Sequence, residues 1–196
     1  MSDIKSAREI AMEKIEKIGT ATEEERLGWK YQPEGEKLAA RYLKHDAELS
    51  VELAKFDKNM AKYIIIGASD VLIKNITLPR DDNARRNNKR AMDGLKIIKS
   101  DKTAVENVFN KIRRIFSHYA EQGEKQKQQA YAALKQDFAA KLEEAVKKQL
   151  GTTSGIKIDV EKQPQFIDEW LKLKARLDSQ YVQLLEEYKQ ELAALP

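Results

Sequence analysis

Apolar residues recur at three- and four-residue steps along most of the chain, which is the spacing of one face of an α-helix. The first such stretch covers residues 2–18, and Gly19 follows it where a helix C-terminal cap belongs. Thr22 and Glu25 then have the spacing of a capping box, which marks the start of another helix. The pattern therefore predicts short N-terminal helices over residues 1–31.

The next stretch repeats its apolar positions every eleven residues, as in the series Leu38, Leu49, Met60 and Val71. This repeat corresponds to ~3.67 residues per turn, which a nearly straight helix can sustain. Pro33 suits the first turn of such a helix, and Pro79 would end it. We therefore predict one long helix over residues 33–78. The apolar end of this stretch, Tyr63–Leu78, is rich in isoleucine, which favours β-strands. A β-strand is therefore the alternative prediction for that end.

Two further segments complete the middle of the chain. Residues 80–100 are first basic and asparagine-rich and then apolar, which predicts an exposed loop followed by a short helix. A second long helix is expected over residues 101–150, with Ser100 or Asp101 as its N-cap. The stretch Glu121–Gln129 carries no large apolar side chain, so it is either a solvated bridge between two contact regions or a hinge at Gly123.

The C-terminal part begins with an alternation of apolar and polar residues over 156–160, which has the two-residue period of a β-strand. A strand of this kind needs a partner, because a lone strand is not stable. Pro164 then opens a helix predicted over residues 164–195. This helix repeats the eleven-residue spacing at Trp170, Tyr181 and Leu192, as antiparallel helices of matched length would.

Two stretches in this C-terminal part, GIKIDVEKQPQFIDEW and LDSQYVQLLEEYKQEL, carry a resemblance to a known family. They resemble an uncharacterised bacterial family of helical proteins, a domain of unknown function. The resemblance covers about the last 45 residues of the chain. It implies a helical fold and brings no catalytic residues with it.

Together these elements predict an all-α fold. We expect an elongated bundle, or an antiparallel coiled coil, of about three long helices with short N-terminal helices and one isolated β-like segment at 156–160. We expect residues 1–196 to form a single elongated domain.

The amino-acid composition limits the cellular environment and the kinds of site that the chain can have. Charged residues make up 35% of the chain and aromatic residues 7%, a balance that suits helices with much exposed surface. The absence of cysteine rules out disulfides, cysteine nucleophiles and thiolate metal sites. No apolar run reaches the ~20 residues that a membrane span requires, and the N-terminus lacks the apolar core of a secretory signal. We therefore expect a cytoplasmic protein with no membrane partner.

The two histidines of the sequence give little support for a catalytic or metal site. His45 lies on one helical face with Glu48 and Glu52, but a helical di-iron site needs paired Glu-x-x-His motifs, and here the order is reversed and occurs once. His45 also fits the eleven-residue repeat as an ordinary position. His118 and its sequence neighbours point to different sides of a helix and form no triad. We expect no enzyme activity, no small-molecule substrate, no cofactor and no metal.

Basic residues concentrate in one segment. Residues 80–102 contain eight basic and four acidic side chains, and this excess equals the net charge of +4 for the whole chain. Such a cluster could bind the phosphates of RNA, on a ribosome for example, although it offers no aromatic residues for base stacking. The candidate nucleic-acid-binding residues are Arg80, Arg85, Arg86, Lys89, Arg90, Lys96, Lys99 and Lys102.

Long amphipathic helices usually serve assembly, because their apolar stripes are covered by other helices of the same chain or of a partner. The leading prediction is a non-enzymatic interaction or assembly protein that self-associates or binds another protein. The alternative is a factor that binds RNA or the ribosome through residues 80–102. The candidate interface residues are Tyr131, Phe138, Ile156, Ile158 and Val160.

Overall fold

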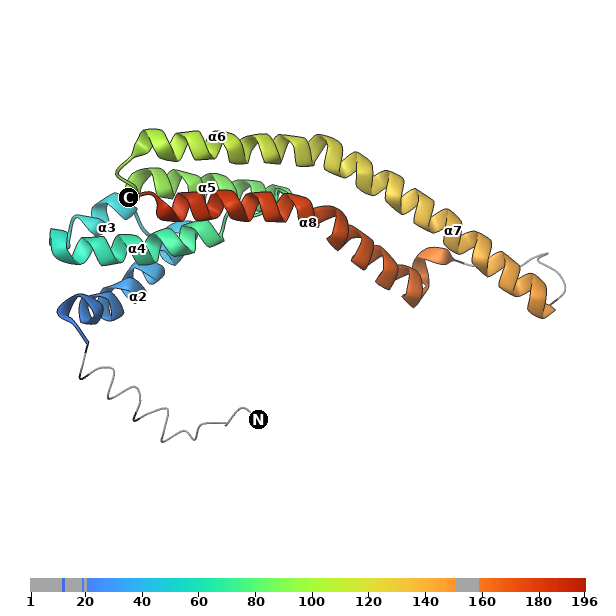
Figure 1. The fold of residues 1–196 in the computed structure, drawn as a ribbon, viewed down its shortest axis with the longest axis horizontal. Coiled ribbons are helices and arrows are strands. Elements are labelled where there is room, and N and C mark those ends of the chain that lie inside the picture. The colour runs from blue at the N-terminus through green and yellow to red at the C-terminus, as the bar shows by residue number, and fades with distance from the viewer. Residues whose placement is uncertain (1–11, 13–18, 20, 151–158) are drawn as a thin grey trace. The chain divides into compact units, whose positions relative to one another are not determined.

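A computed structural model describes residues 12, 19, 21–150 and 159–196 (Figure 1). The described residues form helices and no β-strand, which confirms the all-α fold class. The helices are α2 (Glu23–Leu43), α3 (Leu49–Leu53), α4 (Lys58–Lys74), α5 (Asp82–Ile98), α6 (Lys102–His118), a π-helix η1 (Tyr119–Gly123), α7 (Glu124–Leu150), a 3₁₀-helix η2 (Val160–Lys162) and α8 (Pro164–Ala194). The predicted helix over 2–18 lies outside the described residues.

The chain divides into two compact units, which are described separately. The first comprises the chain up to Ile76 with Asn87–Val105 and Ala193–Pro196, and the second comprises Thr77–Arg86 and Glu106–Leu192. No helix of the described residues is both long and apolar enough to cross a membrane. The prediction of a single domain is not tested by this division and stays a prediction.

Helix α2 begins as its sequence predicts. The Thr22 hydroxyl accepts a hydrogen bond from the Glu25 backbone N–H at 3.2 Å, and the Glu25 carboxylate accepts one from the Thr22 N–H at 2.8 Å. These bonds form the predicted capping box and lower the pKa of Glu25. Pro33 lies inside α2 rather than in the first turn of a new helix. Its fixed φ is helical, so α2 continues through it at the loss of one backbone hydrogen bond.

The single helix predicted over residues 33–78 is wrong, because α2 ends at Leu43 and α3 and α4 follow as separate helices. His45 adopts a left-handed backbone conformation, with φ of 66°, instead of filling a position on a helical stripe. The His45 N–H donates to the carbonyl of Tyr42, and the Asp46 N–H donates to the carbonyl of Arg41. This is the Schellman pattern that closes a helix, here with a histidine where glycine is usual.

Helices α2 and α4 pack against each other through two glycines. A Cβ atom on Gly35 would overlap the backbone carbonyl of Ile64, and a Cβ atom on Gly67 would overlap that of Gln32. The two backbones are therefore in direct contact, and the apolar repeat is satisfied between two helices rather than along one. The stretch Tyr63–Leu78 is mainly helical and largely buried, so its strand alternative is wrong.

Residues 82–98 form the helix α5, where the sequence predicts a loop before a short helix. The Asp81 carboxylate accepts a hydrogen bond from the Ala84 N–H at 2.7 Å and so caps the first turn. Ala91, Leu95 and Ile98 bury the inner side of the helix. The loop was predicted because the start of the segment is rich in asparagine, and that prediction overlooked the apolar face of the helix.

The helix predicted over 101–150 is present as α6, η1 and α7 in succession. The Asp101 carboxylate accepts a hydrogen bond from the Ala104 N–H at 2.9 Å, which confirms Asp101 as its cap. At Tyr119–Gly123 the backbone takes one π-helical turn. The polar stretch is therefore neither a plain bridge nor an open hinge.

Helix α8 starts at Pro164 as predicted. Of the predicted β-like segment, Ile156 and Ile158 lie outside the described residues. Val160 belongs to the 3₁₀-helix η2 and is buried, so it is not part of a strand. In the second unit, α7 continues beyond the start of α8 (Figure 1).

Candidate functional site

The second unit contains a buried cluster of charged side chains around Asp178 of α8. Only 3% of Asp178 is exposed, and 7% of Lys127 of α7. The Asp178 carboxylate accepts hydrogen bonds from Lys127 Nζ at 3.0 Å and the Tyr119 hydroxyl at 3.1 Å, and Arg80 donates to its second oxygen at 3.0 Å. Lys127 also pairs with Glu124 at 3.1 Å. Burial of these charges is possible because each one has a partner of opposite sign.

Both cations of the cluster remain protonated. Burial alone would lower the pKa of Lys127, but its bonds to Tyr119, Asp178 and Glu124 outweigh burial and raise that pKa above the ordinary lysine value. The pKa of Arg80 is raised in the same way, because bonds to Tyr119 and Asp178 outweigh its burial. Lys127 and Arg80 therefore carry their full charge at neutral pH.

The π-helical turn explains why Tyr119 and Lys127 face the same carboxylate. Eight residues of regular α-helix would place them ~80° apart around the helix axis. A π turn adds one residue and so rotates the following helix back by about one residue step, which aligns the two side chains. Gly123 fits this turn closely, since a Cβ atom there would lie 3.2 Å from the Tyr119 ring.

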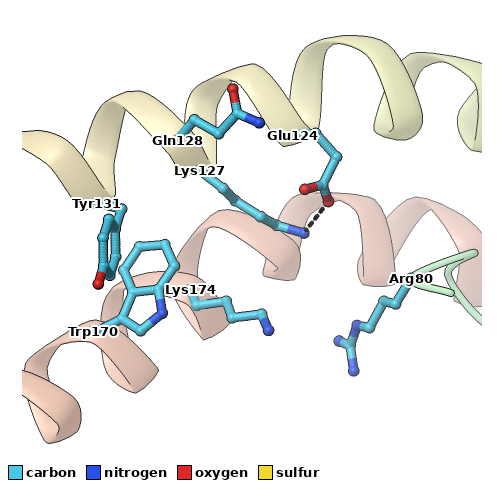
Figure 2. Close-up of a pocket in the computed structure, with 7 residues that line it drawn as sticks. All are labelled: Arg80, Glu124, Lys127, Gln128, Tyr131, Trp170 and Lys174. Carbon is cyan, nitrogen blue, oxygen red and sulfur yellow. Dashed lines mark hydrogen bonds and ion pairs between the residues drawn. The ribbon is translucent and has the colours of Figure 1, made fainter. Parts of the chain in front are cut away.

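A pocket of about 280 Å³ opens beside this cluster, between α7, α8 and the segment that precedes α5 (Figure 2). Lys127 and Arg80 line it from the cluster side. Figure 2 shows Lys174 extending from α8 beside Trp170 toward the side of the pocket that Arg80 occupies. The complete lining is Arg80, Glu124, Lys127, Gln128, Tyr131, Trp170 and Lys174.

Two of the predicted interface residues belong to an aromatic group within the second unit. Tyr131 meets Trp170 edge to face with ring centres 5.0 Å apart, and Phe138 meets Phe166 at 5.5 Å. The Tyr131 hydroxyl donates to Glu161 of η2 at 2.6 Å, and this bond raises the pKa of Tyr131. These contacts attach η2 and the start of α8 to α7. A partner-binding role of Tyr131 and Phe138 stays a prediction.

Beyond Phe138, the apolar residues of α7 are incompletely covered. Leu142 and Val146 continue the apolar stripe, yet both are only partly buried, as is Phe138 itself. On α8, Ile167 and Leu171 are 45% and 58% exposed. The second unit therefore retains accessible apolar surface on both helices.

The eight basic residues of 80–102 have different surroundings. Arg80 is exposed and pairs with the buried Asp178. Arg85 and Arg86 bond to Asp82 and Asn83 within α5, at 3.1 and 2.5 Å. Lys89 and Lys96 are exposed.

The remaining three residues of that segment make contacts inside the first unit. Arg90 stacks on the Tyr42 ring, 4.0 Å from its centre, and donates to the Tyr42 carbonyl at 2.8 Å. Lys99 is buried, which lowers its pKa, and donates to the Leu195 carbonyl at 2.5 Å. Lys102 donates to three carbonyls at the end of α5. RNA binding by the segment stays a prediction.

The histidines lie in separate settings. His45 is exposed at the end of α2, and His118 Nδ1 lies 3.0 Å from the Tyr181 hydroxyl. In the part of the chain that the structure describes, no three acidic or histidine side chains are grouped as a metal ion would require. The absence of enzyme activity and of a cofactor stays a prediction.

Comparison with known proteins places the chain in a family. Residues 50–194 match DUF6657, a family of unknown function. The chain belongs to DUF6657. This membership confirms the resemblance to an uncharacterised domain family, whereas the bacterial origin of that family stays a prediction. The match includes the elements that build the charged cluster and the pocket. No curated protein and no solved structure matches the chain.

Sequence reasoning missed the centre of this site. Lys127 stands in a stretch without apolar residues, so it looked like a solvated lysine. Asp178 offered one signal, because it falls between Leu177 and Tyr181 on the apolar side of α8. A carboxylate at such a position indicates a buried cation nearby.

Proposed function

We propose that this chain is a non-enzymatic assembly protein that pairs with a second copy of itself through the C-terminal half of α7. The observation that carries the proposal is the partly buried apolar stripe of Phe138, Leu142 and Val146. An apolar stripe at four-residue spacing is the surface by which one helix packs on another. We propose the cytoplasm as its compartment, as expected from the sequence.

The stripe itself favours a second copy over an unrelated partner. It is symmetric about Leu142, because Phe138 lies four residues before that residue and Val146 four residues after it. A second copy that runs in the opposite direction therefore presents a stripe of the same spacing.

An antiparallel pair of α7 helices that cross at Leu142 would bring the apolar stripes of the two copies together. Phe138 would lie opposite Val146, and Leu142 opposite its own counterpart. A two-fold symmetric interface requires this self-complementarity, in which each residue and its partner exchange roles between the copies.

The interface would be small and the pairing reversible. The paired segment covers about three helical turns, which is little area for a stable dimer, so we expect a dissociation constant on the order of ten micromolar.

Sedimentation equilibrium of the full chain tests the proposal. The wild-type protein should shift from 22.5 kDa toward twice that mass as its concentration rises through the micromolar range. Leu142→Glu should remain a monomer, because it places a charge at the centre of the stripe. Lys147→Gln is the matched control, since it makes the same change of one charge on the opposite side of α7 and should still dimerise. A wild-type protein that stays at 22.5 kDa at all concentrations would overturn the proposal.

A further inference from the structure

The pocket in Figure 2 has more positive charge than its own carboxylates can neutralise. Its lining contains Arg80, Lys127 and Lys174 against one carboxylate, Glu124. Asp178 behind the pocket adds a second carboxylate, which leaves one positive charge in excess. That excess makes a single anionic group the natural complement of the pocket.

Two of the cations retain hydrogen-bonding capacity. Asp178 takes one bond from Arg80, whose guanidinium carries five N–H donors in a planar fork. The Arg80 side chain is 56% exposed, so further donors can reach a ligand. Lys174 has no ion pair or hydrogen bond with any residue that the structure describes, and it is partly buried in the wall of the pocket.

Part of the pocket wall, next to Lys174, is aromatic. Trp170 and Tyr131 pack edge to face, which holds the indole ring in a fixed orientation. Trp170 is only partly buried and lines the pocket with the amide of Gln128 nearby. An aromatic surface next to cations suits a ligand that joins a flat ring to an anionic group.

We infer that this pocket binds a small ligand with a planar ring and a single carboxylate or phosphate group. The ring lies against Trp170, and the anionic group is held by Lys174 and Arg80. Glu124 and Asp178 oppose ligands of higher charge, so a nucleoside monophosphate fits the pocket better than a triphosphate. The inference does not depend on self-association, because none of the pocket residues belongs to the proposed α7 interface.

Calorimetric titration of the full chain tests this inference with two ring-bearing probes and two ring-free ones. Indole-3-carboxylate and adenosine 5′-monophosphate carry the ring, and acetate and inorganic phosphate carry only the anionic group. At least one ring-bearing probe should bind roughly tenfold more tightly than its ring-free counterpart, as expected for stacking on an aromatic side chain. The probe that binds identifies the anionic group as carboxylate or phosphate.

Two lysines of α8 provide a matched pair of variants for the same titration. Lys174→Gln should weaken binding of that probe roughly tenfold, because it removes a charged hydrogen-bond donor from the anionic group. Lys172→Gln removes the same charge from the other side of α8, where Lys172 pairs with Asp168 at 2.8 Å, and should leave binding unchanged. The inference is overturned if neither ring-bearing probe binds at millimolar concentration, or if the two variants bind equally well.

Discussion

At position 45 a histidine holds the left-handed conformation that ends α2, and at position 178 an aspartate is buried among cations. In both cases one residue shapes the structure around it, His45 through its backbone and Asp178 through its side chain. His45 redirects the backbone so that α2 and α4 become separate helices. Asp178 joins α8 to α7 and to the segment before α5 through Lys127 and Arg80.

Replacement of Asp178 by asparagine should destabilise the protein strongly. The change leaves Lys127 buried with less compensating charge, which costs about 3 kcal/mol of unfolding free energy. Urea unfolding followed by circular dichroism measures this loss. Asp168→Asn is the control, because Asp168 lies on the same helix in an exposed ion pair and should change stability by less than about 1 kcal/mol. Equal effects of the two variants would show that the buried cluster does not stabilise the second unit.

At the level of helices, the sequence predicted the helix caps correctly but not how the helices pack against each other. The caps at Thr22 and Asp101 follow from residues within one turn, and the structure has both. The eleven-residue repeat of residues 33–78 is equally compatible with one helix or with two helices that pack together. Only the contact between the backbones at Gly35 and Gly67 distinguishes them, and that contact involves residues far apart in the sequence.

The charged cluster escaped sequence analysis for a related reason. Whether Lys127 is buried depends on the π turn before it and on Asp178, and neither feature is part of the local pattern around Lys127. The aromatic members of the second unit were easier to identify, because Tyr131 and Phe138 stand out in a polar helix. Their contacts with Phe166 and Trp170 could not be assigned from spacing alone.

Substitution of Gly35 by alanine tests the close contact of α2 and α4. The added methyl group would overlap the Ile64 carbonyl, so the helices must separate, with an expected loss of about 3 kcal/mol in unfolding free energy. Thermal and urea unfolding measure that loss.

Gly28→Ala is the control for this substitution. Its Cβ atom would lie 3.6 Å from the nearest side chain, and alanine favours the helix, so stability should be unchanged or higher by up to about 1 kcal/mol. Unchanged stability of Gly35→Ala would contradict the proposed helix contact.

At the scale of the whole molecule, both proposals concern the second unit. The pocket lies beside the buried cluster, and the proposed interface lies further along α7. If both proposals hold, each chain of the pair carries its own pocket away from the interface. Ligand binding and self-association can therefore be measured independently.

A complementary-charge experiment tests the central claim of self-association most directly. Leu142 faces its own counterpart in the proposed pair, so Leu142→Glu and Leu142→Lys each place two like charges opposite one another, and each variant alone should remain a monomer in the micromolar range. An equimolar mixture of the two variants brings glutamate opposite lysine and should dimerise roughly tenfold more tightly than either variant alone in sedimentation equilibrium. Recovery on mixing would establish that the two copies pair through Leu142, because a folding defect in either variant could not be corrected in this way. A mixture that associates no better than the separate variants would contradict the account.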